Sequence, residues 1–261
     1  MTEGLKKFDE ISLLITHYNR SLSLERLLKD FEDKHICFNE IVVSDDCSRT
    51  EHLNHLEQLK DHYGFKLIKT EKNRGLANNI NKGQRAVSSP FTLYIQEDFV
   101  PTELFCQSLI NGLELIREDP KIDLIRFYAY HKHPYLKPVK NKFSEMEFHF
   151  WRCNFWQFYC YSDHPHLRRS NFPDKFGDYE EGLFSDRAEF KMVISFLQKK
   201  GKSLIHDDYQ KIFTQENSAL EPSQVPRKKF REWLQLTDFF LIKFIRAIYR
   251  NVKFRIDYLF L

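Results

Sequence analysis

Short apolar runs alternate with amphipathic segments along the first half of the chain. The runs have the length and near-continuous hydrophobicity of strands that are covered on both faces; they lie at residues 11–16, 40–44, 65–70, 91–95 and 122–128. In the intervals, apolar residues recur at helical spacing, which predicts helices over residues 24–31, 53–59, 76–87 and 103–117. Strands that alternate with helices predict an α/β fold around a parallel, doubly wound sheet.

The second half of the chain is less regular. Residues 131–173 are rich in aromatic residues, histidine and proline and show no clear periodicity. A helical pattern resumes over residues 186–199 and is stopped by Gly201. A chain of 261 residues is long enough for one large α/β domain, or for one domain with an appendage.

Acidic residues follow two of the predicted strands directly. Asp45 and Asp46 follow the second strand, and Glu97 and Asp98 follow the fourth, after Gln96. The carboxyl ends of parallel strands meet at one edge of a sheet, where such sheets bind ligands. An acid at the end of the second strand could accept hydrogen bonds from a base or a ribose, or it could cap the next helix.

The adjacent acids Glu97 and Asp98 would repel each other unless water or a cation lies between them. Mg²⁺ and Mn²⁺ prefer carboxylate oxygens and often bind one or two carboxylates together with substrate phosphates. We therefore expect Mn²⁺ or Mg²⁺ as cofactor, with a solvated loop as the alternative interpretation.

Four motifs, in this order and spacing, resemble the inverting family 2 glycosyltransferases with the GT-A fold. They read ISLLITHYNR, EIVVSDDCS, KNRGLANNINKG and YIQEDFVP. The resemblance implies a Rossmann-like nucleotide-diphospho-sugar transferase fold and a set of nucleotide-binding residues, with Lys82 nearby. These residues are Thr16, His17, Tyr18, Asn19, Arg20, Asp45, Asp46, Asn73, Arg74, Asn78 and Glu97. Asp98 resembles the metal-binding last acid of the family's DxD motif, whereas Gln96 replaces its first acid.

An inverting transfer needs a general base that takes the proton of the acceptor hydroxyl. The family supplies an acid near the start of a late helix, upstream of a glycine, and counting back from Gly201 gives Glu189. Asp186, Glu181 and Asp178 are alternatives. Each of these acids could instead stabilise a helix N-terminus through its dipole.

Further candidates come from the second half. In some relatives a late histidine completes the metal shell, which makes His206 a candidate ligand beside Asp98, with a surface turn as the alternative. Trp151 and Trp156 could stack on the sugar faces of an acceptor, or belong to the core. Arg168 and Arg169 are candidates for contact with a diphosphate or for solvated surface.

The net charge of +3 is unevenly distributed. Residues 227–261 carry nine Lys or Arg against three Asp or Glu, so the remainder of the chain is net negative. Basicity confined to one tail argues against a nucleic-acid partner. In this tail Lys243, Arg246, Arg250 and Lys253 recur at helical steps and form a cationic stripe. The stripe suits adsorption to an anionic membrane, or else packing on the domain or a dimer contact.

Cysteine usage and the N-terminus bear on location. The five cysteines are odd in number and form no CxxC pair, which argues against a disulfide framework and a cysteine zinc site. We find no pattern typical of a signal peptide and no run as long as a membrane span. We expect a soluble cytoplasmic protein, at most peripheral at the inner face of the cell membrane.

Together these features predict transfer of a sugar from a nucleotide-diphosphate donor, foremost a UDP-sugar, to a glycan or polyprenyl-linked acceptor. The resemblance implies bacterial surface polysaccharide or lipopolysaccharide assembly. We expect a GT-A domain over residues 1–225, divided into a nucleotide-binding half (1–100) and an acceptor-binding half (101–225), then a basic amphipathic helix within 226–261. A non-catalytic module of the same fold is the alternative, favoured by Gln96. A nucleotidyltransferase fits less well, because THYNRSLS lacks the glycine of a phosphate loop.

Overall fold

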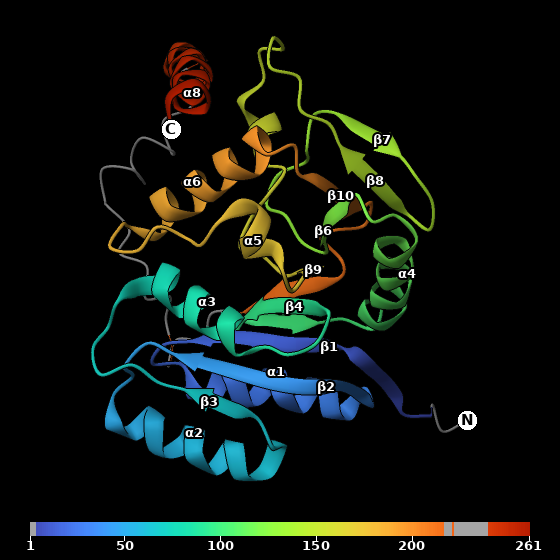
Figure 1. Cartoon of the computed structure of the whole chain (residues 1–261), viewed down its shortest axis with the longest axis vertical. Helices are drawn as coiled ribbons and strands as arrows, with labels where there is room; N and C mark the ends of the chain where they lie inside the picture. Colours follow the sequence, from blue (N-terminus) through green and yellow to red (C-terminus); the bar gives the residue numbers. More distant parts are fainter. Residues whose placement is uncertain (1–3, 217–220, 222–239) are drawn as a thin grey trace.

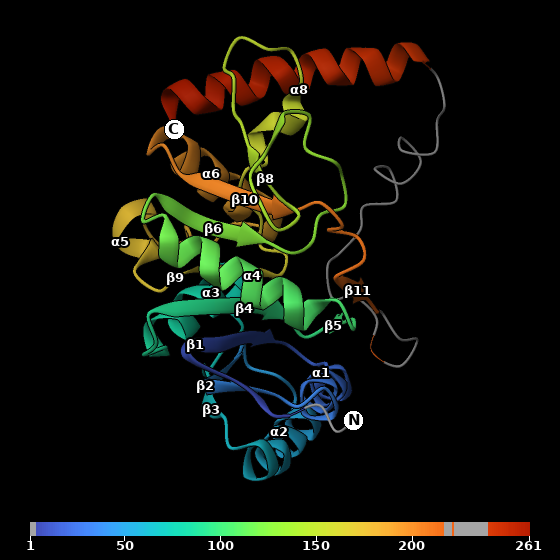
Figure 2. The same cartoon turned by 90° about the vertical axis from the view of Figure 1, so that its right-hand side faces the viewer.

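The computed structural model describes residues 4–216, 221 and 240–261, and the side chains of all these except 240–243. Its centre is a nine-stranded sheet in the order β3-β2-β1-β4-β9-β6-β10-β8-β7 (Figures 1 and 2). Four parallel strands form one half: β1 (Lys6–His17), β2 (Ile36–Asp45), β3 (Lys66–Ile68) and β4 (Phe91–Gln96). The predicted α/β fold with a largely parallel sheet is confirmed.

The other half of the sheet contains strands that the sequence pattern did not predict. The antiparallel strand β9 (His166–Arg169) lies between β4 and β6 (Ile122–Arg126), and β10 (Lys202–His206) runs parallel to β6. The hairpin of β7 (Leu136–Pro138) and β8 (Phe143–Met146) completes the edge. The prediction of a purely parallel sheet was therefore incomplete, because short strands with charged residues leave no clear periodicity.

Helices cover both faces of the sheet. One apolar core joins it to α1 (Ser21–Asp33), α2 (Thr50–Tyr63) and α4 (Phe105–Glu118). A second core joins the opposite face to α3 (Gly75–Ala86), α5 (Phe172–Phe176) and α6 (Ser185–Gln198). Adjacent residues of β1 take part in different cores, Leu13 in the first and Leu14 in the second. This alternation is why the strand is apolar throughout.

A two-stranded ribbon returns the chain to the end of β4. Its strands are β5 (Phe99–Pro101), which follows Asp98, and β11 (Phe213–Gln215), which follows β10 by a short connection. They pair in antiparallel register, with Gln215 opposite Phe99. The ribbon thus brings residues from beyond position 210 to the candidate metal motif.

The C-terminal helix α8 (Phe240–Phe260) lies at the end of the molecule opposite α2 (Figure 1). It packs on α6 and on the short 3₁₀ helix η1 (Phe155–Phe158). Residues 226–239 of the predicted appendage lie outside the described residues. No helix within the described ranges is both long and apolar enough to cross a membrane.

Candidate functional site

The ends of β1 and β2 are joined by a buried histidine–aspartate pair. Nδ1 of His17 lies 2.8 Å from Oδ1 of Asp45, its neighbour in the sheet register. Nε2 of His17 accepts the backbone N–H of Arg20 at 3.2 Å, so the ring proton resides on Nδ1. Burial lowers the pKa of His17, which keeps the ring neutral. His17 and Asp45 therefore hold the loop that follows β1, and both side chains are fully buried.

In the loop that follows β1, one of the predicted nucleotide-binding side chains, the ring of Tyr18, is accessible. Thr16 bonds to the Tyr94 hydroxyl at 3.0 Å, and the Asn19 side chain accepts the Arg49 N–H at 2.8 Å. Among residues 16–20 only Tyr18 is not buried. Tyr18 is thus the side chain of this loop that is placed to stack on a flat ligand.

Asp46 connects β2 to the N-terminus of α3. Its Oδ1 accepts the backbone N–H of Arg74 at 2.8 Å, and its Oδ2 accepts that of Gly75 at 2.7 Å. Gly75 has a φ of +84°, a backbone conformation that favours glycine. The capping alternative is thus observed, but Asp46 caps α3 rather than the helix that follows it in sequence. Lys82 of α3 donates to the carbonyl of Asp45, and burial lowers the pKa of Lys82.

Glu97 and Asp98 lie buried beyond the end of β4, next to the guanidinium of Arg20. Nη1 of Arg20 lies 3.6 Å from Oε1 of Glu97 and 3.3 Å from Oδ2 of Asp98. Burial raises the pKa of Glu97 to about 8, with a further contribution from the Asp98 charge. Arg20 thus offsets part of the repulsion that the sequence predicts between the two acids.

Gln215 was missed by sequence reasoning, yet it contacts the candidate metal residue. Its Nε2 donates to Oδ2 of Asp98 at 2.9 Å, while its Oε1 accepts from the Tyr130 hydroxyl at 2.5 Å. The backbone N–H of Glu216 donates to the Asp98 carbonyl at 2.8 Å. No local pattern marks Gln215, because its position follows from the pairing of β11 with β5.

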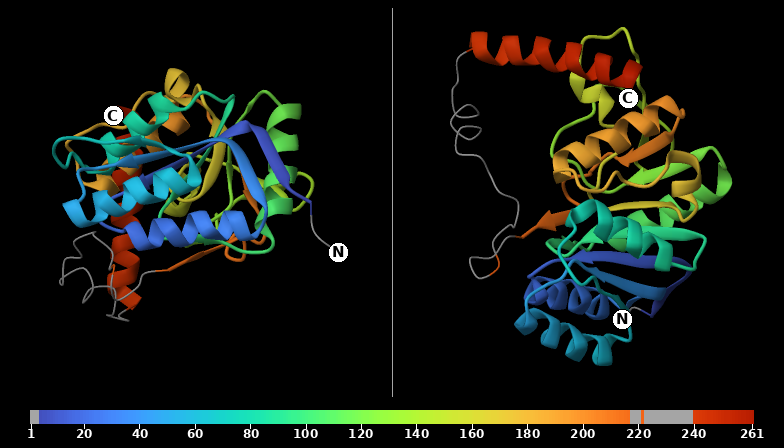
Figure 3. Two further views of the ribbon diagram at one scale, coloured as in Figure 1. Left: turned by 90° about the horizontal axis from the view of Figure 1, so that it is seen from below. Right: turned by 60° about the vertical axis from the view of Figure 1, so that its left-hand side comes forward.

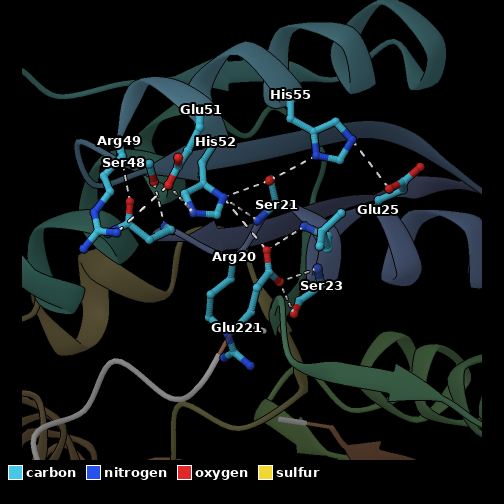
Figure 4. A network of polar contacts seen from close by, with 12 residues as sticks. Arg20, Ser21, Ser23, Glu25, Ser48, Arg49, Glu51, His52, His55 and Glu221 are labelled. Atoms are coloured by element: carbon cyan, nitrogen blue, oxygen red, sulfur yellow. Dashed lines mark hydrogen bonds and ion pairs between the residues drawn. The ribbon is translucent and has the colours of Figure 1, made fainter. Parts of the chain in front are cut away.

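Glu221 was also not identified from the sequence. Its carboxylate binds the N-terminus of α1 (Figure 4). Its carboxylate accepts the backbone N–H groups of Leu22 at 2.9 Å and Ser23 at 2.8 Å, and the Ser23 hydroxyl at 2.7 Å. In Figure 4 this carboxylate lies close to Arg20 and to His52 of α2. The contact fixes the start of α1 directly after the loop that carries Tyr18 and Arg20.

An open cavity of about 610 Å³ adjoins the N-terminus of α3. It is lined by residues from two segments, Asn73, Arg74, Gly75, Glu181, Gly182, Leu183 and Phe184. Glu181 accepts from Arg74 at 2.8 Å and from Asn78 at 2.9 Å. Burial would raise the pKa of Glu181, but hydrogen bonds from Asn81 and Asn78 hold it below the usual value. Glu181 is therefore ionised and engaged, which suits positioning better than proton transfer.

The structure links Glu189 to the metal motif through a residue that the sequence analysis did not single out. Oε1 of Glu189 accepts the backbone N–H of Asp163 at 3.2 Å, and the Asp163 carbonyl accepts Nε2 of Gln96 at 3.2 Å. Burial and the Glu189 charge raise the pKa of Asp163 well above its usual range. Asp186 lies exposed in the first turn of α6, and Asp178 pairs with Arg85.

Three other candidates, His206, Arg168 and Arg169, have their contacts with residues other than the acids at the end of β4 in the described part of the chain. His206 contacts Ser108 at 3.4 Å and the ring of Phe143, and none of its contacts in the described part of the chain reaches Asp98. Arg168 is buried and donates to Gln84 at 2.7 Å, so it is core rather than diphosphate ligand or solvated surface. Arg169 likewise donates to backbone carbonyls, including that of Ile122 at 3.0 Å.

The two candidate acceptor tryptophans occupy different surroundings. Trp156 is half-buried and packs against His131, with ring centroids 4.0 Å apart. Trp151 is exposed and contacts Phe150, whose carbonyl accepts Nε of Arg255 from α8. The structure thus places Trp151 beside the C-terminal helix, and it places Trp156 next to Phe155, which contacts Phe254 of the same helix.

Comparison with known proteins identifies the family. The sequence profile of Glycosyl transferase family 2 matches residues 12–179, more than half of the chain. The chain belongs to this family. The match includes the four motifs that carry the resemblance, except Ile11 at the start of the first, and ends two residues before Glu181.

Two curated relatives share part of this family 2 chain. An uncharacterized glycosyltransferase of Haemophilus influenzae is 26% identical over 119 residues, 44% of this chain and 37% of the relative. A cholesterol galactosyltransferase of Borreliella burgdorferi is 26% identical over 121 residues, 46% of this chain and 33% of the relative. The matched segments thus amount to about a third of each relative's length.

Solved structures share the fold of this family 2 chain at low identity. S. aureus TarS 1–349 in complex with UDP-GlcNAc gives a TM-score of 0.57 at 17% identity, over 87% of this chain and 65% of that chain. The mannosyltransferase PcManGT of Pyrobaculum calidifontis, in complex with GDP-Man and Mn²⁺, gives 0.54 at 11% identity, over 92% and 64%. These likenesses show the GT-A fold.

A divalent ion, which the fold family implies, fits the residues at the end of β4. Within the described residues, Oδ1 of Asp98 is buried and has no hydrogen-bond partner, whereas its Oδ2 is engaged by Arg20 and Gln215. A buried carboxylate oxygen without a partner is costly unless a donor or cation meets it. In the same described ranges no three His, Cys, Asp or Glu side chains gather into a complete metal cage. One or two carboxylates suffice where phosphates supply the other ligands.

Proposed function

We propose that this family 2 member is a glycosyltransferase that moves a sugar from a nucleotide-diphosphate donor to an acceptor hydroxyl with inversion. The observation that carries the proposal is the buried acid pair Glu97–Asp98 at the end of β4, in which Oδ1 of Asp98 is left without a partner. An unpaired buried carboxylate oxygen at the ligand-binding edge of an α/β sheet marks a functional position rather than a stabilising one.

The donor is proposed to be a UDP-sugar, and the support comes from the fold neighbours and the loop after β1. TarS is described with UDP-GlcNAc and GalNAc-T7 with UDP, whereas PcManGT is described with GDP-Man. In this chain Tyr18 is available to stack on the base, and the N-terminus of α3 is held by Asp46. The cavity beside α3 is large enough for part of a nucleotide sugar.

The divalent ion is proposed to bind Oδ1 of Asp98, with Glu97 beside it. When bound, such an ion neutralises charge on a departing diphosphate as a Lewis acid. Gln215 and Arg20 orient Asp98 by binding its other oxygen. Arg20 supplies a second positive charge next to the same acids.

Glu189 is proposed as the general base that takes the proton of the acceptor hydroxyl. Its support is the chain of contacts Glu189–Asp163–Gln96, which connects α6 with the first position of the metal motif. Gln96 stands where the family's motif has an acid, and its amide holds the backbone at Asp163. Asp186 remains the rival base, and Glu181 is better suited to hold Arg74 and Asn78.

The acceptor is proposed to be a glycan or a polyprenyl-linked glycan in bacterial surface polysaccharide assembly, near the inner face of the membrane. Trp156 and His131 offer two rings in tilted contact, 39° between their planes, for an acceptor sugar. A lipid-borne acceptor accords with the cationic residues of the C-terminal helix, and the B. burgdorferi relative is named for transfer to a lipid, cholesterol.

A non-catalytic member of the same fold is the second candidate. Gln96 in place of an acid, and the ion pairs of Arg20 with Glu97 and Asp98, would both suit a module that binds without turnover. The two candidates differ in whether a bound nucleotide sugar is ever consumed.

The deciding experiment is a thermal-shift screen of UDP, GDP, dTDP and CMP with and without Mn²⁺, repeated on Asp98→Asn. A ligand that binds only the native state raises the melting temperature by mass action. We expect one diphosphate, UDP, to stabilise the wild type only with Mn²⁺ and to leave the variant unchanged. Binding of UDP-sugar without hydrolysis or transfer would favour the non-catalytic candidate, and no shift with any nucleotide would contradict both.

A further inference from the structure

The helix α8 is attached to the domain by one face only. Phe254 is buried against Phe190 and Phe158, and Arg255 donates to the carbonyls of Phe150 at 3.0 Å and Arg152 at 2.6 Å. Asp257 pairs with Arg187 of α6 at 3.1 Å. In Figures 2 and 3 the helix lies crosswise over one end of the molecule, so its opposite face points away from the domain.

That outward face is apolar. Seven large apolar residues at helical spacing are each between 49% and 81% exposed: Ile245, Ile248, Tyr249, Val252, Ile256, Leu259 and Phe260. At 100° per residue they fall within one third of the helix circumference, opposite Phe254. Contiguous exposed apolar surface of this kind marks an interaction site.

Positive charge lies along the edge of this face. Over Phe240–Phe260 the sequence has five Lys or Arg and one Asp. Arg246, Arg250 and Lys253 follow one side of the apolar stripe, and Arg250 reaches over the ring of Phe155. The cationic stripe that the sequence predicts is therefore present at the edge, while the centre of the outward face is apolar.

An exposed tryptophan lies beside the same helix. Trp151 is 87% exposed, and the residues on either side of it, Phe150 and Arg152, accept hydrogen bonds from Arg255. Tryptophan is enriched at membrane–water interfaces, where an amphipathic ring is partly wet. Its exposure beside α8 makes Trp151 available to a membrane that meets this helix.

We propose that the outward face of α8, together with Trp151, binds the surface of an anionic lipid membrane with the helix axis in the membrane plane. An apolar stripe bordered by Lys and Arg is the pattern of an interfacial helix, in which the cations meet anionic headgroups. Twenty-one residues extend about 31 Å along the membrane at 1.5 Å per residue. A second protein copy would be expected to offer acids opposite these cations, but Asp257, the helix's own acid, pairs within the chain with Lys253 at 2.6 Å and with Arg187 at 3.1 Å. Arg246 and Arg250 are therefore the cations of this edge that we assign to anionic headgroups.

Membrane binding through α8 would also orient the domain at the lipid surface. The meaning of this orientation rests on the proposed function, because it depends on where the acceptor binds. Arg250 packs on Phe155, next to Trp156 and His131, which are the proposed acceptor residues. Membrane contact through α8 would therefore place the acceptor side of the domain near the lipid, as a lipid-linked acceptor requires. Membrane binding itself is measured without donor or acceptor, so its failure and the failure of the proposed transfer are distinguishable.

The test is co-sedimentation of the full chain with vesicles of phosphatidylcholine alone or mixed with phosphatidylglycerol. We expect binding to the anionic vesicles, weakened by salt, and a loss of about tenfold or more in Ile248→Glu/Ile256→Glu, because each Glu would have to enter the lipid interface. The matched control, Leu104→Glu/Val139→Glu, replaces two exposed apolar residues away from α8 and should bind as the wild type does.

Two further measurements keep the test decisive. Light scattering reports a dimer, and quenching of tryptophan fluorescence by brominated lipid, compared between wild type and Trp151→Phe, reports insertion without altering α8. Absence of binding to anionic vesicles would overturn the proposal. Unchanged vesicle binding in Ile248→Glu/Ile256→Glu would also overturn it. So would a wild type that forms a dimer but does not bind vesicles, together with a variant that is monomeric.

Discussion

Oδ2 of Asp98 accepts a hydrogen bond from Nε2 of Gln215 at 2.9 Å, across 117 positions of sequence. The contact exists because β11 pairs with β5, the strand that directly follows Asp98. With Oδ2 engaged in this way, Oδ1 of Asp98 is the oxygen left for a cation within the described chain. Gln215 therefore orients the carboxylate of Asp98 without being a ligand itself.

We expect Gln215→Leu to weaken the metal dependence of nucleotide binding. Loss of a hydrogen bond that orients a ligating group typically costs about 10- to 100-fold in metal affinity. The Mn²⁺ concentration that gives half of the UDP-induced thermal shift should rise accordingly. Gln210→Leu, on the exposed connection before β11, is the control and should need no more Mn²⁺ than the wild type. Equal requirements in both variants would contradict the role of Gln215.

Asp46→Ala should lower the free energy of unfolding. Removal of the carboxylate leaves the N–H groups of Arg74 and Gly75 at the N-terminus of α3 without their acceptor. The expected loss is about 2 kcal/mol, as for other helix caps with two partners. Urea unfolding measures it, with Asp61→Ala on the exposed side of α2 as the control, expected within about 0.5 kcal/mol of the wild type. A variant as stable as this control would show that the cap is dispensable.

Glu189→Gln and Glu181→Gln should affect different kinetic constants. Loss of a general base lowers kcat by about 10²- to 10⁴-fold, which we expect for Glu189→Gln in a radiolabelled-sugar transfer assay. Glu181→Gln should chiefly raise KM for the donor, because Glu181 holds Arg74 and Asn78 at the cavity beside α3. If kcat survives in Glu189→Gln but falls in Asp186→Asn, the base is Asp186 instead.

His164 should make the protein less stable in weak acid. The ring lies among Phe99, Tyr128 and Tyr130, and burial lowers the pKa of His164 to about 3, against 6.5 in the unfolded chain. Because the folded pKa is depressed, the unfolded chain binds the extra proton. The stability that the neutral ring contributes is complete above pH 6.5 and is lost as the pH falls towards the folded pKa.

Between pH 6.5 and 5.5 this single group should cost about 1 kcal/mol in the free energy of unfolding. Urea unfolding at the two pH values measures this loss. The free energy of unfolding of His164→Gln should decrease less than that of the wild type, and the difference should be that amount. His62→Gln, at an exposed position on α2, should decrease as the wild type does. Identical decreases in all three proteins would contradict the assigned pKa of His164.

The elements with the clearest local pattern were predicted well. The runs at residues 11–16, 40–44 and 91–95 lie within β1, β2 and β4, because strands covered on both faces must be apolar at every position. The strand β9 was not predicted. It has two arginines in four residues, and Arg168 is stabilised there by Gln84 of α3, a partner that no local pattern reveals.

The sequence by itself determined the alternation of strands and helices in the first half of the chain, the acids at two strand ends, and an amphipathic C-terminal helix with a cationic stripe. These are properties of short segments, because periodicity and strand-end polarity are set by residues a few positions apart. Strand-end polarity predicted Asp46 as a polar residue at the site edge, and the family resemblance implied His17 there, but neither predicted their partners.

The tertiary structure alone decided which groups meet. It joined Asp98 to Arg20 and Gln215, directed Asp46 to α3, and placed Glu221 on the start of α1. It also decided that the apolar face of α8 points away from the domain, whereas Phe254 is buried. Such contacts depend on strand order and packing over many tens of residues, and hydrogen-bond partners at that distance leave no trace in the local sequence.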